Sequence, residues 1–171
     1  MTEVTPSQDY LAQTGEKPVL PGSINVLTIL TFIGCGLGFL GACWNFINAK
    51  KGLDQMETAI NSPEYENMPA LAKKFLSPEA LEIARKSYEN RIPITLIGLI
   101  GIALCLYGAL QMRKRKMNGY YMYVVGEILP LISTIIFIGM GALTGIFGLI
   151  SIGFIVLFIL LYTAQRKHLT S

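Results

Sequence analysis

Hydrophobic residues gather in four long runs along the chain, and the polar residues lie between and outside these runs. The runs cover about residues 24–45, 92–112, 120–138 and 142–163. Each run has about the 20 residues with which an α-helix crosses a hydrocarbon core of about 30 Å. Because a backbone in lipid must satisfy its own hydrogen bonds, each run is predicted to be a helix. The pattern therefore predicts an all-α, polytopic membrane protein with four transmembrane helices.

Charged residues are excluded from these runs, apart from Glu127 in the third. Hydrophobic residues make up 52% of the chain and charged residues 15%, whereas soluble domains have about 25% charged residues. A soluble helical protein would carry charges along one face of each helix. The predicted helices are apolar on all faces, and this favours lipid as their surroundings.

The polar segments predict a tail and a membrane domain with a cap. Residues 1–22 are rich in Thr, Pro, Gln and Gly, and they lack a periodic apolar pattern. They are predicted to be a flexible polar tail that precedes a membrane domain over residues 23–171. The long polar segment within that domain, residues 47–91, lies between the first two runs.

Short amphipathic helices are predicted in residues 47–91. Ser62-Pro63-Glu64 and Ser77-Pro78-Glu79 each combine an N-cap serine, a proline at the first helical position and an acid that suits the helix dipole. A further helix is indicated by Leu53, Met56 and Ile60, and it can continue the first run out of the membrane. This segment is therefore interpreted as a helical cap.

The basic residues predict the orientation in the membrane. In a four-span protein the N-terminus, the second connection and the C-terminus share one side. The second connection contains a run of four basic residues, Arg113, Lys114, Arg115 and Lys116. The positive-inside rule then predicts that both termini are cytoplasmic and that the cap is outside. The run is expected to anchor the topology beside anionic lipid headgroups, and specific recognition of a lipid or protein is the alternative.

Glu127 is the candidate functional residue, with Gly126 and Pro130 beside it. It lies about 10 Å inside the third run by helical rise. An ionised acid in hydrocarbon is costly, so it should face the bundle interior or water. Pro130 frees the carbonyl of Gly126 from its helical hydrogen bond. Two interpretations stay open. Glu127 is a proton site, cation site or inter-subunit contact, or it is a protonated or hydrogen-bonded structural acid near the cytoplasmic interface, which a basic side chain from residues 113–116 can reach.

Small residues at a spacing of four predict close helix packing. Gly34 and Gly38 lie in the first run, and Gly141 and Gly145 lie in the fourth. Such pairs let helix backbones approach closely. Packing within the chain is the favoured interpretation, and association with a second copy or another membrane subunit is the alternative.

The connection around residues 139–141 is only long enough for a turn. It therefore predicts a tight antiparallel hairpin of the last two runs.

Candidate chemistry for catalysis or cofactor binding is absent from the sequence. The three cysteines, Cys35, Cys43 and Cys105, fall within the apolar runs and form no CxxC pair. No GxSxG, HExxH or P-loop motif occurs, and no acidic cluster suits a metal ion. We therefore expect no enzyme activity, no cofactor and no metal. The net charge of +3 gives no indication of nucleic-acid binding.

The segment Asn25-Val26-Leu27-Thr28-Ile29-Leu30-Thr31-Phe32-Ile33-Gly34 resembles the start of small four-span bacterial inner-membrane proteins that carry no assigned activity. The basic turn and the glycine-rich last run also resemble the corresponding segments of those proteins in composition. The resemblance implies a bacterial inner membrane location and transfers no catalytic motif.

Two functional hypotheses follow. The leading one is an interaction or accessory protein, which binds another membrane protein or a second copy of itself in the lipid bilayer. The alternative is a small oligomeric translocator of protons, ions or solutes that uses Glu127.

Overall fold

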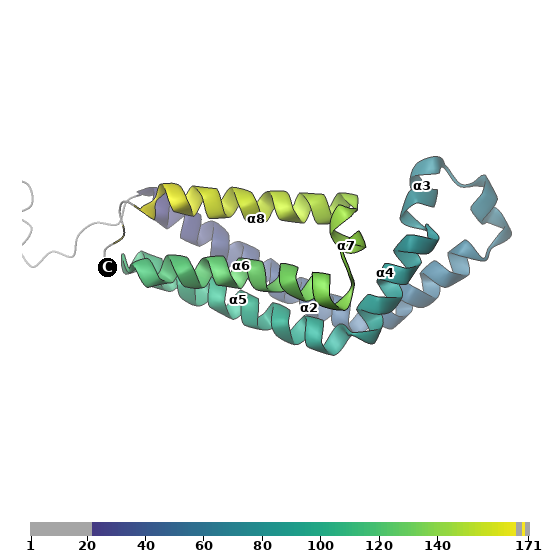
Figure 1. Cartoon of the computed structure of the whole chain (residues 1–171), viewed down its shortest axis with the longest axis horizontal. Helices are drawn as coiled ribbons and strands as arrows, with labels where there is room; N and C mark the ends of the chain where they lie inside the picture. Colours follow the sequence, from purple (N-terminus) through teal and green to yellow (C-terminus); the bar gives the residue numbers. More distant parts are fainter. Residues whose placement is uncertain (1–21, 167–168, 170–171) are drawn as a thin grey trace, which may run out of the picture.

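The computed structural model describes residues 22–166 and Leu169, and every regular element in them is helical. The predicted tail, residues 1–22, lies outside the described residues except for Gly22, where the first helix begins. Four helices are long and apolar enough to cross a membrane (Figure 1). They are α2 (Gly22–Ile60), α5 (Arg91–Arg113), α6 (Met117–Phe137) and α8 (Ile146–Ala164).

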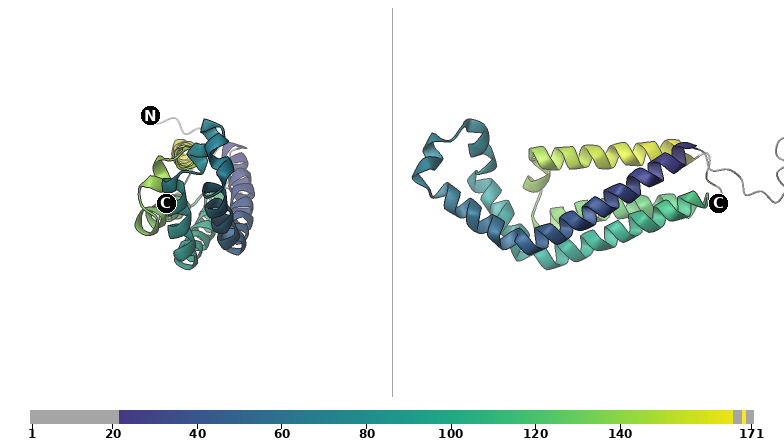
Figure 2. Two further views of the ribbon diagram at one scale, coloured as in Figure 1. Left: turned by 90° about the vertical axis from the view of Figure 1, so that its right-hand side faces the viewer. Right: turned by 180° about the vertical axis from the view of Figure 1, so that it is seen from behind.

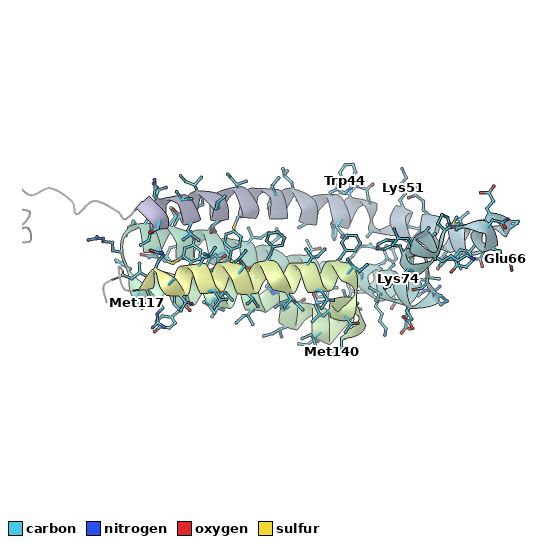
Figure 3. The ribbon with its side chains drawn as sticks, turned by 90° about the horizontal axis from the view of Figure 1, so that it is seen from above. Trp44, Lys51, Glu66, Lys74, Met117 and Met140 are labelled. Carbon is cyan, nitrogen blue, oxygen red and sulfur yellow. The ribbon has the colours of Figure 1, made fainter. Side chains whose placement is uncertain are left out.

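The first of these, α2, is a single helix of 39 residues. At about 1.5 Å per residue it is almost 60 Å long, about twice the thickness of a hydrocarbon core. Its second half leaves the bundle and continues into the cap, as the apolar spacing of Leu53, Met56 and Ile60 predicted. Trp44 lies near the level at which α2 leaves the other helices (Figure 3), and tryptophan favours the membrane–water interface.

The cap is completed by three short helices that return the chain to the bundle: η1 (Pro63–Asn67), α3 (Ala70–Phe75) and α4 (Pro78–Glu89). Ser77 caps α4 as predicted, because its hydroxyl accepts a hydrogen bond from the Ala80 amide at 3.2 Å. The Ser62 hydroxyl instead donates to the Ala59 carbonyl at 3.0 Å. A 3₁₀ helix rather than an α-helix follows Ser62.

Two contacts hold the cap together, and a third joins it to α8. Arg85 of α4 forms an ion pair of 2.7 Å with Glu57 of α2. The guanidinium of Arg91, the first residue of α5, lies 4.4 Å from the centroid of the Tyr88 ring. The rings of Phe75 and Phe147 are 5.8 Å apart and connect α3 with α8.

Helices α5 and α6 form an antiparallel hairpin in which two pairs of glycines bring the backbones together. A Cβ at Gly101 would lie 2.8 Å from the Gly126 carbonyl oxygen, and a Cβ at Gly126 would lie 2.8 Å from the Gly101 oxygen. The pair Gly108 and Gly119 is equally close, with reciprocal distances of 2.7 and 2.6 Å. No larger residue fits at these four positions without a shift of the backbone.

The last apolar run is not one helix, which corrects the prediction for residues 142–163. A short helix α7 (Gly141–Thr144) precedes α8, and Gly145 between them is extended, with φ −69° and ψ 164°. The reason is that α7 folds onto the first turn of α8. A Cβ at Gly148 would lie 2.6 Å from the Leu143 Cα, so this close contact requires glycine. The tight hairpin predicted for the last two runs is therefore wrong.

One end of the bundle gathers the start of α2, the α5–α6 turn and the end of α8, and the cap lies at the other end (Figures 1 and 2). Met117 marks the first end, and Glu66 lies far out in the cap (Figure 3). This arrangement places the predicted cytoplasmic segments together. Which side of a membrane they occupy stays a prediction.

We predict that Gly126→Ala destabilises the protein by about 1–3 kcal/mol, since the added methyl group meets backbone atoms that cannot rotate away. Gly34→Ala is the matched control, because a Cβ at Gly34 meets no atom within 4 Å. Reversible unfolding in mixed detergent micelles measures both changes. Equal stability of the two variants would show that the α5–α6 contact is looser than described.

Candidate functional site

A cavity of about 260 Å³ lies between the long apolar helices, and polar side chains form part of its lining. Its deep wall consists of buried residues from α2, α5 and α6, namely Thr31, Cys35, Gly101, Cys105, Tyr123 and Gly126. Its outer part is lined by exposed residues of α2 and α8, among them Leu30, Gly34 and Phe154. The cavity thus has a polar floor and an apolar mouth.

Glu127 lines this cavity and is half-buried. It lies ten residues after Met117, so it is about 15 Å along α6 from the basic turn. Among the described residues, no Lys or Arg lies within ion-pairing distance of its carboxyl group. The structural interpretation with a basic partner from residues 113–116 therefore finds no support in these contacts.

A phenol and a thiol line the cavity together with Glu127. They belong to Tyr123, one helical turn earlier on α6, and to Cys105 of α5. The Cys105 thiol also approaches the Tyr123 carbonyl at 3.8 Å, and the Cys35 thiol approaches the Ile102 carbonyl at 3.9 Å. All of these groups can donate a hydrogen bond to a carboxylate or to a molecule bound beside it.

Pro130 and Gly126 shape α6 next to Glu127. Pro130 lies inside the helix and leaves the Gly126 carbonyl without its usual backbone donor. That carbonyl faces Gly101 of α5, where the absence of a side chain leaves room for it. The structure therefore brings the three predicted residues together at one wall of the cavity.

Tyrosines of α6 and α8 pack together at the end of the bundle that holds the α5–α6 turn. The Tyr123 and Tyr162 rings are 4.5 Å apart, and the Tyr162 hydroxyl is 2.7 Å from the Thr31 hydroxyl. The Tyr120 hydroxyl is 2.8 Å from that of Thr163. These contacts join α2, α6 and α8, so α8 is attached to the bundle mainly at this end.

The predicted glycine pairs lie away from the closest backbone contacts within the chain. A Cβ at Gly34 would meet no atom within 4 Å, and a Cβ at Gly38 would meet the flexible Ile102 side chain at 3.6 Å. Gly141 begins α7 and Gly145 forms the break before α8, and both line a second, apolar pocket of about 580 Å³ beside the cap. The closest contacts between α5 and α6 are formed by Gly101, Gly108, Gly119 and Gly126 instead. A packing role of the predicted glycine pairs stays a prediction.

The basic run lies at the α5–α6 turn. Arg113 ends α5 and Lys116 precedes α6, and Arg115 has a positive φ of 62°, in the left-handed region. Arg113, Lys114 and Lys116 are exposed. Their position at one end of the bundle agrees with a role beside lipid headgroups, which stays a prediction.

Sequence reasoning missed most of the residues around Glu127. The spacing of four between Tyr123 and Glu127 places them on one face of α6, and this signal was available. The contributions of Thr31, Cys35 and Cys105 come from other helices, and their meeting depends on how the helices pack. In the described part of the chain, no three His, Cys, Asp or Glu side chains are grouped so that they could hold a metal ion.

Comparison with known proteins provides no relative for this chain. No protein-family model, no curated protein and no solved structure matches it. The resemblance of its first apolar run to bacterial inner-membrane proteins therefore stays a prediction, and the site must be interpreted from its own chemistry.

The contact between Thr31 and Tyr162 is expected to stabilise the attachment of α8. In a double-mutant cycle with Thr31→Val and Tyr162→Phe, we predict a coupling free energy of about 0.6–1 kcal/mol, as for other hydrogen bonds between helices in membranes. Unfolding in mixed micelles measures it. Tyr107→Phe is the control partner, because the Tyr107 hydroxyl accepts its hydrogen bond within α5, and its effect should add to that of Thr31→Val. Additivity in both cycles would contradict the prediction.

Proposed function

We propose that this chain is a multi-pass membrane protein that translocates protons or small cations through Glu127, as one subunit of an assembly. The observation that supports this function is the position of Glu127, a lone acid in the apolar helices that lines a cavity. Ionisable groups within a membrane are costly and mark pathways for protons, ions or substrates. From the resemblance of the first apolar run we propose the bacterial inner membrane as the location, and from the basic turn we propose that both termini are cytoplasmic.

The surroundings of Glu127 suit a group that changes its protonation state. A carboxylate can accept hydrogen bonds from Tyr123 and Cys105, whereas a protonated carboxyl group can donate to the carbonyl and hydroxyl oxygens nearby. Both states thus find partners in the same cavity. Four helices are few for a complete pathway, and so the proposal includes assembly with further copies.

Proton flux into liposomes tests this function. We expect the purified protein to dissipate a pH gradient that is monitored with an enclosed dye, and Glu127→Gln to reduce the rate to that of protein-free liposomes. The amide keeps the shape of the side chain and removes the titratable proton. Glu64→Gln is the matched control, because Glu64 is an exposed acid of the cap, and its flux should equal that of the wild type. Equal flux in both variants would exclude a role of Glu127.

A second candidate function, that of an interaction or accessory protein, is favoured by the open glycines of α2. Gly34 and Gly41 are seven residues apart on one face of α2, and a Cβ at either would have no neighbour within 4 Å. Small residues at such a spacing allow another helix to approach closely. The face is therefore available to a second copy or to another membrane protein.

Native mass spectrometry of nanodiscs extracted from the host membrane separates the two candidates. If the wild type is a homo-oligomer and Gly41→Ile lowers the oligomeric fraction, the result would support assembly into a translocator. A stoichiometric second protein lost in Gly41→Ile would support the accessory function. Gly52→Ile is the control, since Gly52 is equally open but lies on the part of α2 beyond the bundle. A monomer without a partner would contradict both.

A further inference from the structure

The cavity around Glu127 opens sideways, between α2 and α8. Leu30, Gly34 and Phe154 line it and are exposed at the surface of the bundle. Helix α2 runs diagonally, from the end of α8 near the termini towards α5 near the cap, so α2 and α8 diverge (Figure 2). In a bilayer this mouth faces hydrocarbon. A ligand that enters here must therefore be soluble in the membrane.

The floor of the cavity selects for positive charge. Glu127 is the acid in its lining, and the surrounding hydroxyls and thiols of Thr31, Tyr123, Cys35 and Cys105 carry no positive charge. A bare calcium or magnesium ion requires about six oxygen ligands, which one carboxylate and two hydroxyls do not supply. An organic cation has no such coordination requirement, and a single carboxylate can neutralise it.

Aromatic rings supply the remaining surface that an organic cation needs. Tyr123, Phe154 and Phe158 line the cavity together with Glu127. The face of an aromatic ring attracts a cation, and this attraction is stronger in a site without water. The volume of about 260 Å³ is slightly below the range of about 300–1,000 Å³ typical of ligand pockets. It suits a compact ligand.

We infer that the cavity binds a small hydrophobic organic cation, such as an aromatic quaternary ammonium compound, which enters from the bilayer between α2 and α8 and pairs with Glu127. This inference rests on the proposed function for the role of Glu127 and adds the class of ligand. Because one carboxylate serves both the ligand and the proton, their binding is competitive.

Equilibrium binding to the protein in nanodiscs tests the inference with two probes of the same shape. Benzyltrimethylammonium is the cation, and neopentylbenzene, in which carbon replaces the charged nitrogen, is the neutral control. Protein-free nanodiscs give the partition of each probe into lipid. We expect saturable binding of the cation above this partition and none of the neutral compound.

Variants assign the binding to the cavity. Glu127→Gln should lower the affinity for the cation by about a hundredfold or more, since it removes one partner of a desolvated charge pair. Glu127→Asp keeps the charge and should retain part of the affinity, which distinguishes lost charge from misfolding. Phe158→Leu should weaken binding by about threefold to tenfold. Phe147→Leu is the control for Phe158→Leu, since Phe147 also lies on α8 but packs on Phe75 outside the cavity. This control should bind the cation with the affinity of the wild type.

Acid should release the cation, since protonation removes the charge of Glu127. The other titratable side chains in the cavity lining are Cys35 of α2, Cys105 of α5 and Tyr123 of α6, and Tyr162 of α8 packs against Tyr123. They are neutral when protonated and acquire no positive charge in acid, so they do not reproduce this effect. Affinity should fall by up to about tenfold per pH unit once the carboxyl group is mostly protonated.

The outcomes separate this inference from the proposed function. Proton flux that depends on Glu127, without binding of benzyltrimethylammonium, would overturn the organic-cation site and leave the translocator. Saturable binding that depends on Glu127, without flux of any kind, would support the site and overturn translocation. Equal binding of the two probes, or binding unchanged in Glu127→Gln, would also overturn the inference.

Discussion

The close backbone contact between α5 and α6 is the constraint on which the rest of the bundle depends. Lipid is as apolar as the side chains, so helices in a membrane gain little from hydrophobic burial and associate through close packing. The pairs of Gly101 with Gly126 and Gly108 with Gly119 provide that packing. They also fix how α6 is rotated. Because successive residues of an α-helix are about 100° apart, a glycine at 126 against α5 turns Glu127 aside, into the cavity.

Helix α8 is held in a different way, and the difference matters for the cavity. Within α8, Tyr162 is the buried residue, and it is hydrogen-bonded to Thr31 near the termini. At its other end, Phe147 packs on Phe75 of the cap. The cavity lies between these two attachments. Regions with few buried contacts open most easily, so α8 is the wall whose displacement would change the size of the mouth, while the α5–α6 hairpin keeps Glu127 in place.

The sequence predicted well what depends on local composition. The length of each apolar run, the Ser77 cap and the continuation of α2 into the cap follow from hydrophobicity, spacing and capping chemistry. The break at Gly145 was missed because it depends on the contact of α7 with Gly148, which is tertiary. The packing glycines of α5 and α6 were not identified, for the same reason. A spacing of four identifies a small-residue face, but the contacts formed at a spacing of seven, where two antiparallel helices had matching glycines.

Part of the site could be predicted from the sequence, and the rest depends on how the helices pack. A single acid in an apolar run is conspicuous, so Glu127, Gly126 and Pro130 could be chosen without a structure. The hydroxyls and thiols that make the acid tolerable are ordinary residues on three helices, and none is unusual in its own run. An isolated charge in hydrocarbon is too costly to persist, whereas one beside Tyr123, Cys105 and a cavity has partners for both protonation states. The same arrangement that lowers the cost of the charge also leaves it at the wall of a cavity, as the proposed binding of a cation requires.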